Sequence, residues 1–237
     1  MPILYQVDQN SDDWDRLRLG IPTASEFKKI LTPAGKLSKQ ADKYMMKLLA
    51  EWYFGGPLED PQTQYQSEWM ERGHFLEQQA VDSFELEWNV ATIPGGFVTT
   101  DDGRVGCSPD RLIGDDGVLE IKNPSPTNHM KFMVERSVDD EHYPQVQGQL
   151  YICERQYAAV VSHCPAFPDV IIRVPRDEEY IGHLADALLQ FNEKLDQFKT
   201  LIEKQYGRVE RTARSCGPVE EFDRMGVTME DLPDSDF

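Results

Sequence analysis

One stretch of the chain, residues 104–123, most narrowly limits what the protein can fold into. Short apolar runs flank the tetrapeptide Gly114-Asp115-Asp116-Gly117, whose residue types favour a tight turn. The pattern predicts two antiparallel strands, over 104–113 and 118–123, joined as a hairpin. Such a hairpin brings residues near its open end side by side, although the turn separates them in the sequence.

Charged residues gather at that open end. Glu120 and Lys122 are two positions apart in one strand, so their side chains share a face while Ile121 points into the core. Asp110 enters from the far end of the paired strand. Two carboxylates on one face suit a hard cation such as Mg2+ or Mn2+, and the neighbouring ammonium can orient and acidify an attacking water. We interpret the cluster as the metal site of a nuclease. The alternative is that Asp110 closes a turn and Glu120 forms a surface ion pair with Lys122.

The order of several motifs along the chain resembles that of one family. Pro109-Asp110 followed by Glu120-Ile121-Lys122 is similar to the PD-(D/E)xK nuclease motif. The other segments in family order are 14–26, 73–77, 107–110 and 145–147. Together they resemble the phage lambda exonuclease family of YqaJ-like viral recombinase nucleases. This resemblance implies an α/β fold with a restriction-endonuclease-like core, in which helices flank a central mixed twisted sheet.

The resemblance also implies a set of metal ligands. These are Asp110, Glu120, the backbone carbonyl of Ile121 and the helical acid Glu77, which together would hold Mg2+, or Mn2+, as two ions per site. Lys122 would position or help to deprotonate the attacking water. For Glu77 the ordinary alternative is a solvated acid on a helix surface.

Three further positions would line or shape the active site by the same resemblance. Gln147 and Tyr151 form a Gln-x-x-x-Tyr pair, spaced so that both lie on one helical face. Met70 corresponds to the apolar wedge that parts the terminal base pair. The alternative for Met70 is that its side chain packs in the hydrophobic core.

Arg18, Ser25 and Ser108 correspond to a pocket for the 5′-terminal phosphate of the digested strand. Arginine offers a planar fork to phosphate oxygens, and serine hydroxyls supply further donors. Each residue has an alternative as a surface residue or a helix cap. A terminal phosphate held there would place the scissile phosphodiester bond, one nucleotide further along the strand, over the metals. This arrangement would explain both the 5′→3′ direction of digestion and the release of one nucleotide at a time.

The function implied is a metal-dependent 5′→3′ exonuclease that degrades one strand of double-stranded DNA from its ends. It would release 5′-mononucleotides and leave 3′ single-stranded DNA for annealing recombination. Family relatives imply a homotrimer and a partner that anneals single strands. Two alternatives stay open: a site-specific endonuclease on the same core, and a non-catalytic module that binds DNA ends.

Length and charge indicate the domain organisation and the kind of DNA-binding surface to expect. The 237 residues fit a single nuclease domain over 1–216, followed by an acidic tail over 217–237 that has few apolar residues to bury. The formal charge is −18, of which the tail contributes −6, so we expect a local positive groove for DNA in place of a basic surface. No apolar run reaches the roughly 18 residues needed to span a bilayer, and we expect a protein of the bacterial cytoplasm.

Periodicity predicts the other elements. Helices are expected after Ser11 and over 24–31, 38–54, 63–87, 127–135, 143–154 and 177–204, with Thr23 and Glu26 as a capping box. Strands are expected over 96–100, 157–164 and 169–174 as well as in the hairpin. The four cysteines include no Cys-x-x-Cys pair, which argues against zinc and against a disulfide framework.

Overall fold

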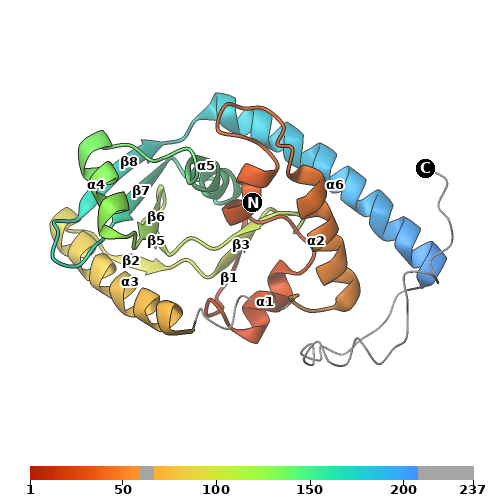
Figure 1. Cartoon of the computed structure of the whole chain (residues 1–237), viewed down its shortest axis with the longest axis horizontal. Helices are drawn as coiled ribbons and strands as arrows, with labels where there is room; N and C mark the ends of the chain where they lie inside the picture. Colours follow the sequence, from red (N-terminus) through yellow and green to blue (C-terminus); the bar gives the residue numbers. More distant parts are fainter. Residues whose placement is uncertain (59–66, 208–237) are drawn as a thin grey trace.

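The computed structural model describes residues 1–58 and 67–207, without the side chains of 67–75 (Figure 1). The acidic segment 217–237 and the side chain of Met70 therefore lie outside the described residues. The described helices are α1 (Asp12–Arg18), the 3-10 helix η1 (Ala24–Lys29), α2 (Ala41–Phe54), α3 (Ser67–Trp88), α4 (Pro126–Glu135), α5 (Tyr143–Ile152) and α6 (Glu178–Tyr206). Within this part of the chain, no helix is long and apolar enough to cross a membrane.

Two sheets organise the described residues. The larger has the order β2 (Thr92–Pro94), β5 (Arg111–Ile113), β6 (Gly117–Lys122), β7 (Tyr157–Ser162) and β8 (Val170–Pro175), and the smaller has the order β1 (Ile3–Tyr5), β3 (Phe97–Thr99) and β4 (Gly106–Cys107). The pairing of β6 with β7 is parallel, whereas β5 with β6 and β7 with β8 are antiparallel. The predicted mixed sheet is confirmed, and the predicted hairpin is β5–β6, joined by the predicted turn.

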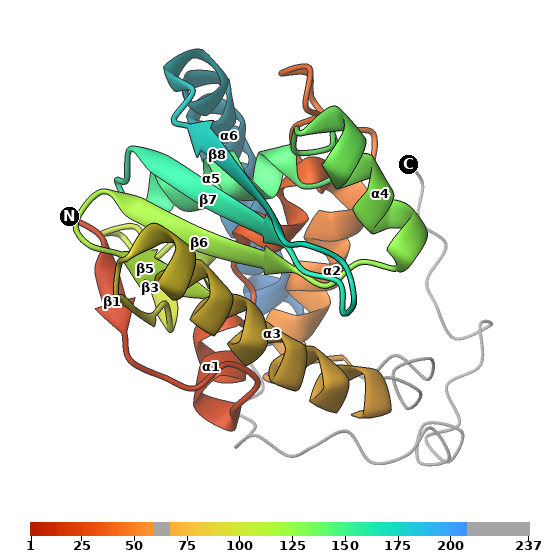
Figure 2. The same ribbon diagram turned by 90° about the vertical axis from the view of Figure 1, so that its left-hand side faces the viewer.

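Strand β6 is buried on both faces, and its alternate residues enter two different clusters. Leu119 and Ile121 belong to a cluster with Ala80, Val81 and Phe84 of α3. Figure 2 shows α3 crossing one face of the sheet at β6. Because this face is covered by apolar side chains, α3 shields one side of the strand from water.

The opposite face of β6 lies against the main core. Val118 belongs to a large cluster that includes Val146 and Leu150 of α5 and residues of η1, α2 and α6. Glu120 and Lys122 follow Val118 at two-residue intervals, so they leave the strand on this α5 side. The layer arrangement thus sends the charged residues of β6 toward α5 and its apolar residues toward α3.

Several local predictions differ from the structure. The expected strand 104–113 is two strands, because Ser108-Pro109-Asp110 separates β4 from β5, and proline cannot donate a ladder hydrogen bond. The three-residue strands β1 and β2 were not predicted. Ser11 caps α1 as expected and accepts from the backbone N–H of Trp14 at 3.3 Å. The capping box at Thr23 is wrong, because that side chain makes no cap bond and the helix is 3-10.

Candidate active site

Asp110 is tied directly to the strand that carries the other charged residues. It follows the short loop after β4, and its Oδ2 accepts a hydrogen bond from the backbone N–H of Ile121 at 2.5 Å. Ile121 lies between Glu120 and Lys122 in β6, so the bond fixes Asp110 beside both. The structure therefore brings the three predicted charged residues together at one end of the β5–β6 hairpin.

Glu120 is held by three donors. Its side chain is buried, with a residue exposure of 4%. Oε1 accepts from Lys122 Nζ at 2.7 Å and from Gln145 Nε2 at 2.7 Å, and Oε2 accepts from Gln149 Nε2 at 2.5 Å. A buried carboxylate is costly unless it is paired and hydrogen-bonded, and these contacts provide both. The Glu120–Lys122 pair is thus not the exposed surface pair of the alternative interpretation.

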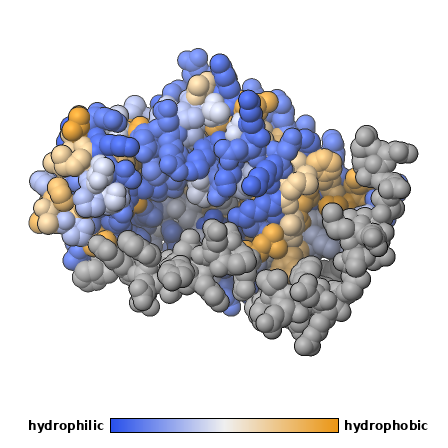
Figure 3. Space-filling model, in the orientation of Figure 1, coloured by the Kyte–Doolittle hydropathy of each residue, from blue (hydrophilic) through white to orange (hydrophobic). Residues whose placement is uncertain are grey.

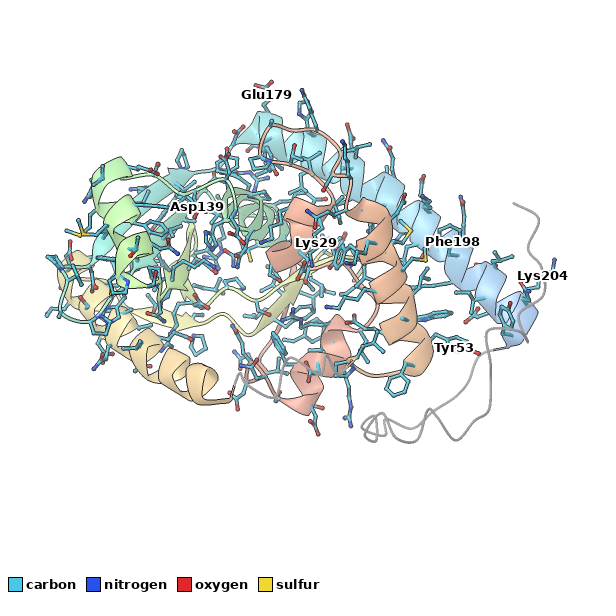
Figure 4. All side chains as sticks on the ribbon, viewed as in Figure 1. Lys29, Tyr53, Asp139, Glu179, Phe198 and Lys204 are labelled. Carbon is cyan, nitrogen blue, oxygen red and sulfur yellow. The ribbon has the colours of Figure 1, made fainter. Side chains whose placement is uncertain are left out.

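The ammonium of Lys122 is placed by two residues at once. Besides Glu120, it donates to Gln145 Oε1 at 3.0 Å. Burial alone lowers the pKa of Lys122, but the nearby carboxylates of Glu120, Asp110 and Asp139 outweigh it, so the pKa is raised and the side chain is charged. Asp139, labelled in Figure 4, lies just before α5.

Burial and neighbouring carboxylates both disfavour the ionised form of Asp110. Burial raises its pKa well above the usual range, and the negative charges of Glu120 and Glu77 raise it further. The Ile121 N–H and the Lys122 ammonium oppose this effect without reversing it. Glu77 of α3 thus lies near enough to Asp110 to act on it electrostatically, and its role as a metal ligand stays a prediction.

These residues fit a divalent metal by their donor chemistry. Mg2+ and Mn2+ prefer oxygen ligands, and a cation would relieve the repulsion that Asp110 experiences. The amide oxygen Oε1 of Gln149 is also buried here without a hydrogen-bond partner. In the described part of the chain, however, no three His, Cys, Asp or Glu side chains already form a metal-binding group. The predicted ligand set is therefore compatible with the structure in chemistry and stays a prediction.

The predicted phosphate-binding residues line the same cavity as the carboxylates. A pocket of about 220 Å³ is bordered by Gln9, Trp14, Arg18, Thr23, Ala24, Ser25, Ser108, Asp110, Glu120, Gln145 and Gln149. Arg18 comes from α1, Ser25 from η1 and Ser108 from the loop after β4, so three distant segments converge. Figure 3 shows hydrophilic side chains across the middle of one face, around a hollow between the apolar regions at either side.

Trp14 holds two of the proposed phosphate ligands in place. Its indole Nε1–H donates to Ser108 Oγ at 2.8 Å, and the guanidinium of Arg18 lies 3.7 Å from the centre of its ring. Burial lowers the pKa of Arg18, and the nearby Tyr44 and Asp15 oppose this shift. An arginine stays protonated despite such a shift because its ordinary pKa is so high. The role of Trp14 was not predicted, although its i,i+4 spacing from Arg18 is a usable signal.

The predicted pair on α5 is wrong. Gln147 is fully buried; its Nε2 donates to the Pro175 carbonyl and its Oε1 accepts from the Asp177 N–H. Tyr151 packs against the main core, where burial and then Asp102 raise its pKa. Both residues lie on the side of α5 away from the carboxylates.

The side of α5 that faces the carboxylates carries another pair. Gln145 and Gln149 are also four residues apart, and both donate to Glu120. Gln145 stands in a motif used for the resemblance, but neither residue was predicted as part of the site. Their positions two residues before Gln147 and Tyr151 explain the error, since a shift of two turns a helix by about 200°.

Solved structures share this fold over most of the chain. The alkaline exonuclease from Laribacter hongkongensis matches with a TM-score of 0.72 and 24% identity, over 82% of this chain and 97% of that one. Its complex with dAMP matches with a TM-score of 0.71 and the same identity and coverage. A phage-related exonuclease from Haemophilus somnus 129PT matches with a TM-score of 0.61 and 14% identity, over 77% and 96%. A search of curated proteins finds no match.

The fold and a family model together define the class of protein. The mixed sheet, the flanking helices and the structural matches confirm a restriction-endonuclease-like α/β core. The family model of the YqaJ-like viral recombinase domain matches residues 13–156, which is more than half of the chain. The chain therefore belongs to the YqaJ-like viral recombinase family, as the motif order indicated.

Proposed function

We propose that this chain is a metal-dependent 5′→3′ exonuclease that degrades one strand of double-stranded DNA from its ends. One observation supports the proposal most: Arg18, Ser25 and Ser108 line the same pocket as Asp110 and Glu120. A terminal phosphate bound by the first three would hold the next phosphodiester bond beside the two acids. Such binding holds the scissile bond in a fixed position beside the catalytic groups, which speeds the reaction. It also accounts for the 5′→3′ direction and for the stepwise release of 5′-mononucleotides.

The metal would be held by the carboxylates of Asp110, Glu120 and Glu77 and the carbonyl of Ile121. Bound Mg2+, or Mn2+, as two ions, supplies Lewis acidity and lowers the pKa of a bound water. Lys122 donates hydrogen bonds that orient the attacking water and offset negative charge on the phosphate.

Other residues of the chain position the catalytic and phosphate-binding side chains. Gln145 and Gln149 hold the Glu120 carboxylate, and Gln145 also holds the Lys122 ammonium. Arg18, stacked on Trp14, binds the terminal phosphate through its planar fork. Because Trp14 also donates to Ser108, it fixes the spacing between two phosphate ligands.

The relatives extend the proposal beyond the single chain. The Laribacter hongkongensis alkaline exonuclease has been solved in complex with dAMP, a 5′-mononucleotide of the kind that we propose as product. By resemblance to the family, we also propose a homotrimer that encloses DNA and a partner protein that anneals the 3′ single strand. The site of action would be the cytoplasm of a bacterial host, where the DNA ends are found.

A digestion series tests this function. Linear duplexes with 5′-phosphate or 5′-hydroxyl ends are incubated with Mg2+ or with a chelator, and the products are separated by length. We expect rapid release of 5′-mononucleotides from the phosphorylated duplex with Mg2+, slow release from the hydroxyl duplex, and none with the chelator. Arg18→Ala should remove the preference for phosphate.

Two controls separate the alternative functions. A covalently closed circle should resist the enzyme, because it has no end; cleavage of the circle would favour the site-specific endonuclease. A folded wild-type protein that binds phosphorylated duplex but never digests it would favour the non-catalytic end-binding module.

A further inference from the structure

A second pocket adjoins the proposed active site. It has a volume of about 210 Å³ and lies between α1 and α2. Trp14, Arg18 and Thr23 line both pockets, so the two cavities meet at the proposed phosphate ligand. The volume is below the roughly 300 Å³ of sites that take drug-sized ligands, so a single ring system suits it.

The walls of this second pocket combine apolar side chains with charged ones, and its polar groups include both donors and acceptors. Leu19, Ile21 and Leu48 line it together with Lys47 and Glu51. Lys47 Nζ lies 3.5 Å from Glu51 Oε1, and the Glu51 side chain is only 15% exposed. Figure 4 shows Tyr53 near the C-terminal end of α2.

The charges of the pocket decide against a second phosphate. Asp15, Glu26 and Glu51 outnumber Arg18 and Lys47 among the lining residues. The acids lie close enough to Arg18 to oppose the lowering of its pKa that burial causes. An additional anion would meet net negative charge, whereas a neutral planar ring with amino and carbonyl groups would find complementary partners.

A nucleotide carries such a ring at a short, fixed distance from its phosphate. In a nucleotide, the 5′-phosphate and the base are attached to the same sugar, so a phosphate at Arg18 places its base only one sugar away. We propose that the second pocket receives the unpaired base of the 5′-terminal nucleotide while Arg18 binds its phosphate. This inference rests on the proposed function and adds a recognition site to it: the enzyme holds the end of the strand by base and phosphate together.

Substrates that differ only in the terminal base test the proposal. Two 5′-phosphorylated duplexes carry a mismatched terminal nucleotide, so that neither has a base pair to open; in one of them that nucleotide is abasic. Release of the first nucleotide is measured with enzyme in excess. We expect the wild type to bind and process the abasic end about tenfold less efficiently, a size typical of losing one stacked base.

A matched pair of variants on α2 locates the effect. Lys47→Trp would plug the pocket from its edge, whereas Lys43→Trp adds the same ring at an exposed position that lines neither pocket. We expect Lys47→Trp to process both ends equally and to keep its preference for 5′-phosphate, while Lys43→Trp discriminates like the wild type. Equal rates for the two ends with the wild type, or full discrimination by a folded Lys47→Trp, would overturn the proposal.

A binding measurement keeps the result independent of digestion. A 5′-phosphorylated strand with terminal 2-aminopurine is titrated with protein in a chelator. Its fluorescence should change on binding to the wild type and to Lys43→Trp but not to Lys47→Trp. If the wild type digests no substrate, the proposed function fails, and this titration still decides whether the pocket takes a base.

Discussion

The two faces of strand β6 have similar burial but opposite chemistry. On the α3 side, Leu119 and Ile121 pack into an apolar cluster. On the α5 side, Glu120 is also buried, yet both of its oxygens are hydrogen-bonded by lysine and glutamine side chains. The comparison shows that burial alone does not separate structure from function in this strand; the partners of each buried group do.

The low exposure of the polar face has a chemical purpose in the proposed reaction. Charges interact more strongly where water is excluded, so a fixed ammonium and carboxylate act more effectively there than on the surface. The apolar face supplies the rigidity that keeps them fixed, because close-packed side chains resist displacement. Changes on the two faces should therefore affect different measurements.

The largest effect is expected from Glu120→Gln on the polar face. The variant keeps the size of the side chain but loses the negative charge that pairs with Lys122 and would bind metal. We expect the rate of DNA digestion to fall by at least about a thousandfold, as measured by release of mononucleotides from phosphorylated duplex. Glu87→Gln, at an exposed position of α3, serves as the matched control. Residual activity within tenfold of the wild type would remove Glu120 from the mechanism.

A change on the apolar face should act on stability instead. Leu119→Ala removes a fully buried side chain from the α3 cluster. We expect the free energy of unfolding to fall by about 2–5 kcal/mol, as measured by urea denaturation. The digestion rate per folded molecule should stay within about threefold of the wild type under conditions where the variant is folded. A large loss of rate without loss of stability would show that the two faces are not separable.

The two sides of α5 also differ, one contacting Glu120 and the other packing in the core, and we expect smaller effects from changes there. Gln149→Ala removes a donor to Glu120, and we expect digestion to slow by about 10- to 100-fold, in line with loss of a charged hydrogen bond. Gln147→Ala leaves the Asp177 N–H and the Pro175 carbonyl without their partner. We expect that variant to lose about 1–3 kcal/mol of stability and little activity. The reverse pattern would restore the original prediction for Gln147.

The error on α5 shows what the sequence alone does not determine. Buried residues occur all around this helix, including Pro144, Val146, Gly148 and Leu150, so no single apolar stripe marks its inward side. Both glutamine-led pairs have the same i,i+4 spacing. Which pair faces β6 depends on how the helix packs in the folded protein.

The carboxylates were predictable because their arrangement is local. One turn and the two-residue period of a strand suffice to bring Asp110, Glu120 and Lys122 together. Arg18 and Ser25 lie far from Ser108 in the sequence, and only the family resemblance indicated that the three residues line one pocket. The contact from Trp14 to Ser108 and the second pocket required the structure, because both depend on how α1 packs against distant segments.

The smallest effect, and the most direct test of the polar face, is the response of folding stability to metal. Burial and the carboxylates of Glu120 and Glu77 raise the pKa of Asp110, which means that ionised Asp110 is unfavourable in the folded protein without a cation. A bound Mg2+ would remove that penalty in the folded state only. At a Mg2+ concentration about ten times its dissociation constant, the gain is about 1.4 kcal/mol, or a few degrees in Tm for a protein of this size.

Asp110→Asn supplies the matched comparison for that measurement. The amide keeps the size of the side chain and lacks the charge, so the variant should show little Mg2+-dependent rise in Tm, whether or not it digests DNA. Without Mg2+ at neutral pH, its Tm should equal or exceed that of the wild type, because the repulsion from Glu120 and Glu77 is gone. An equal rise in wild type and variant would place the metal elsewhere, and the polar face of β6 would then be a buried ion pair without a role in catalysis.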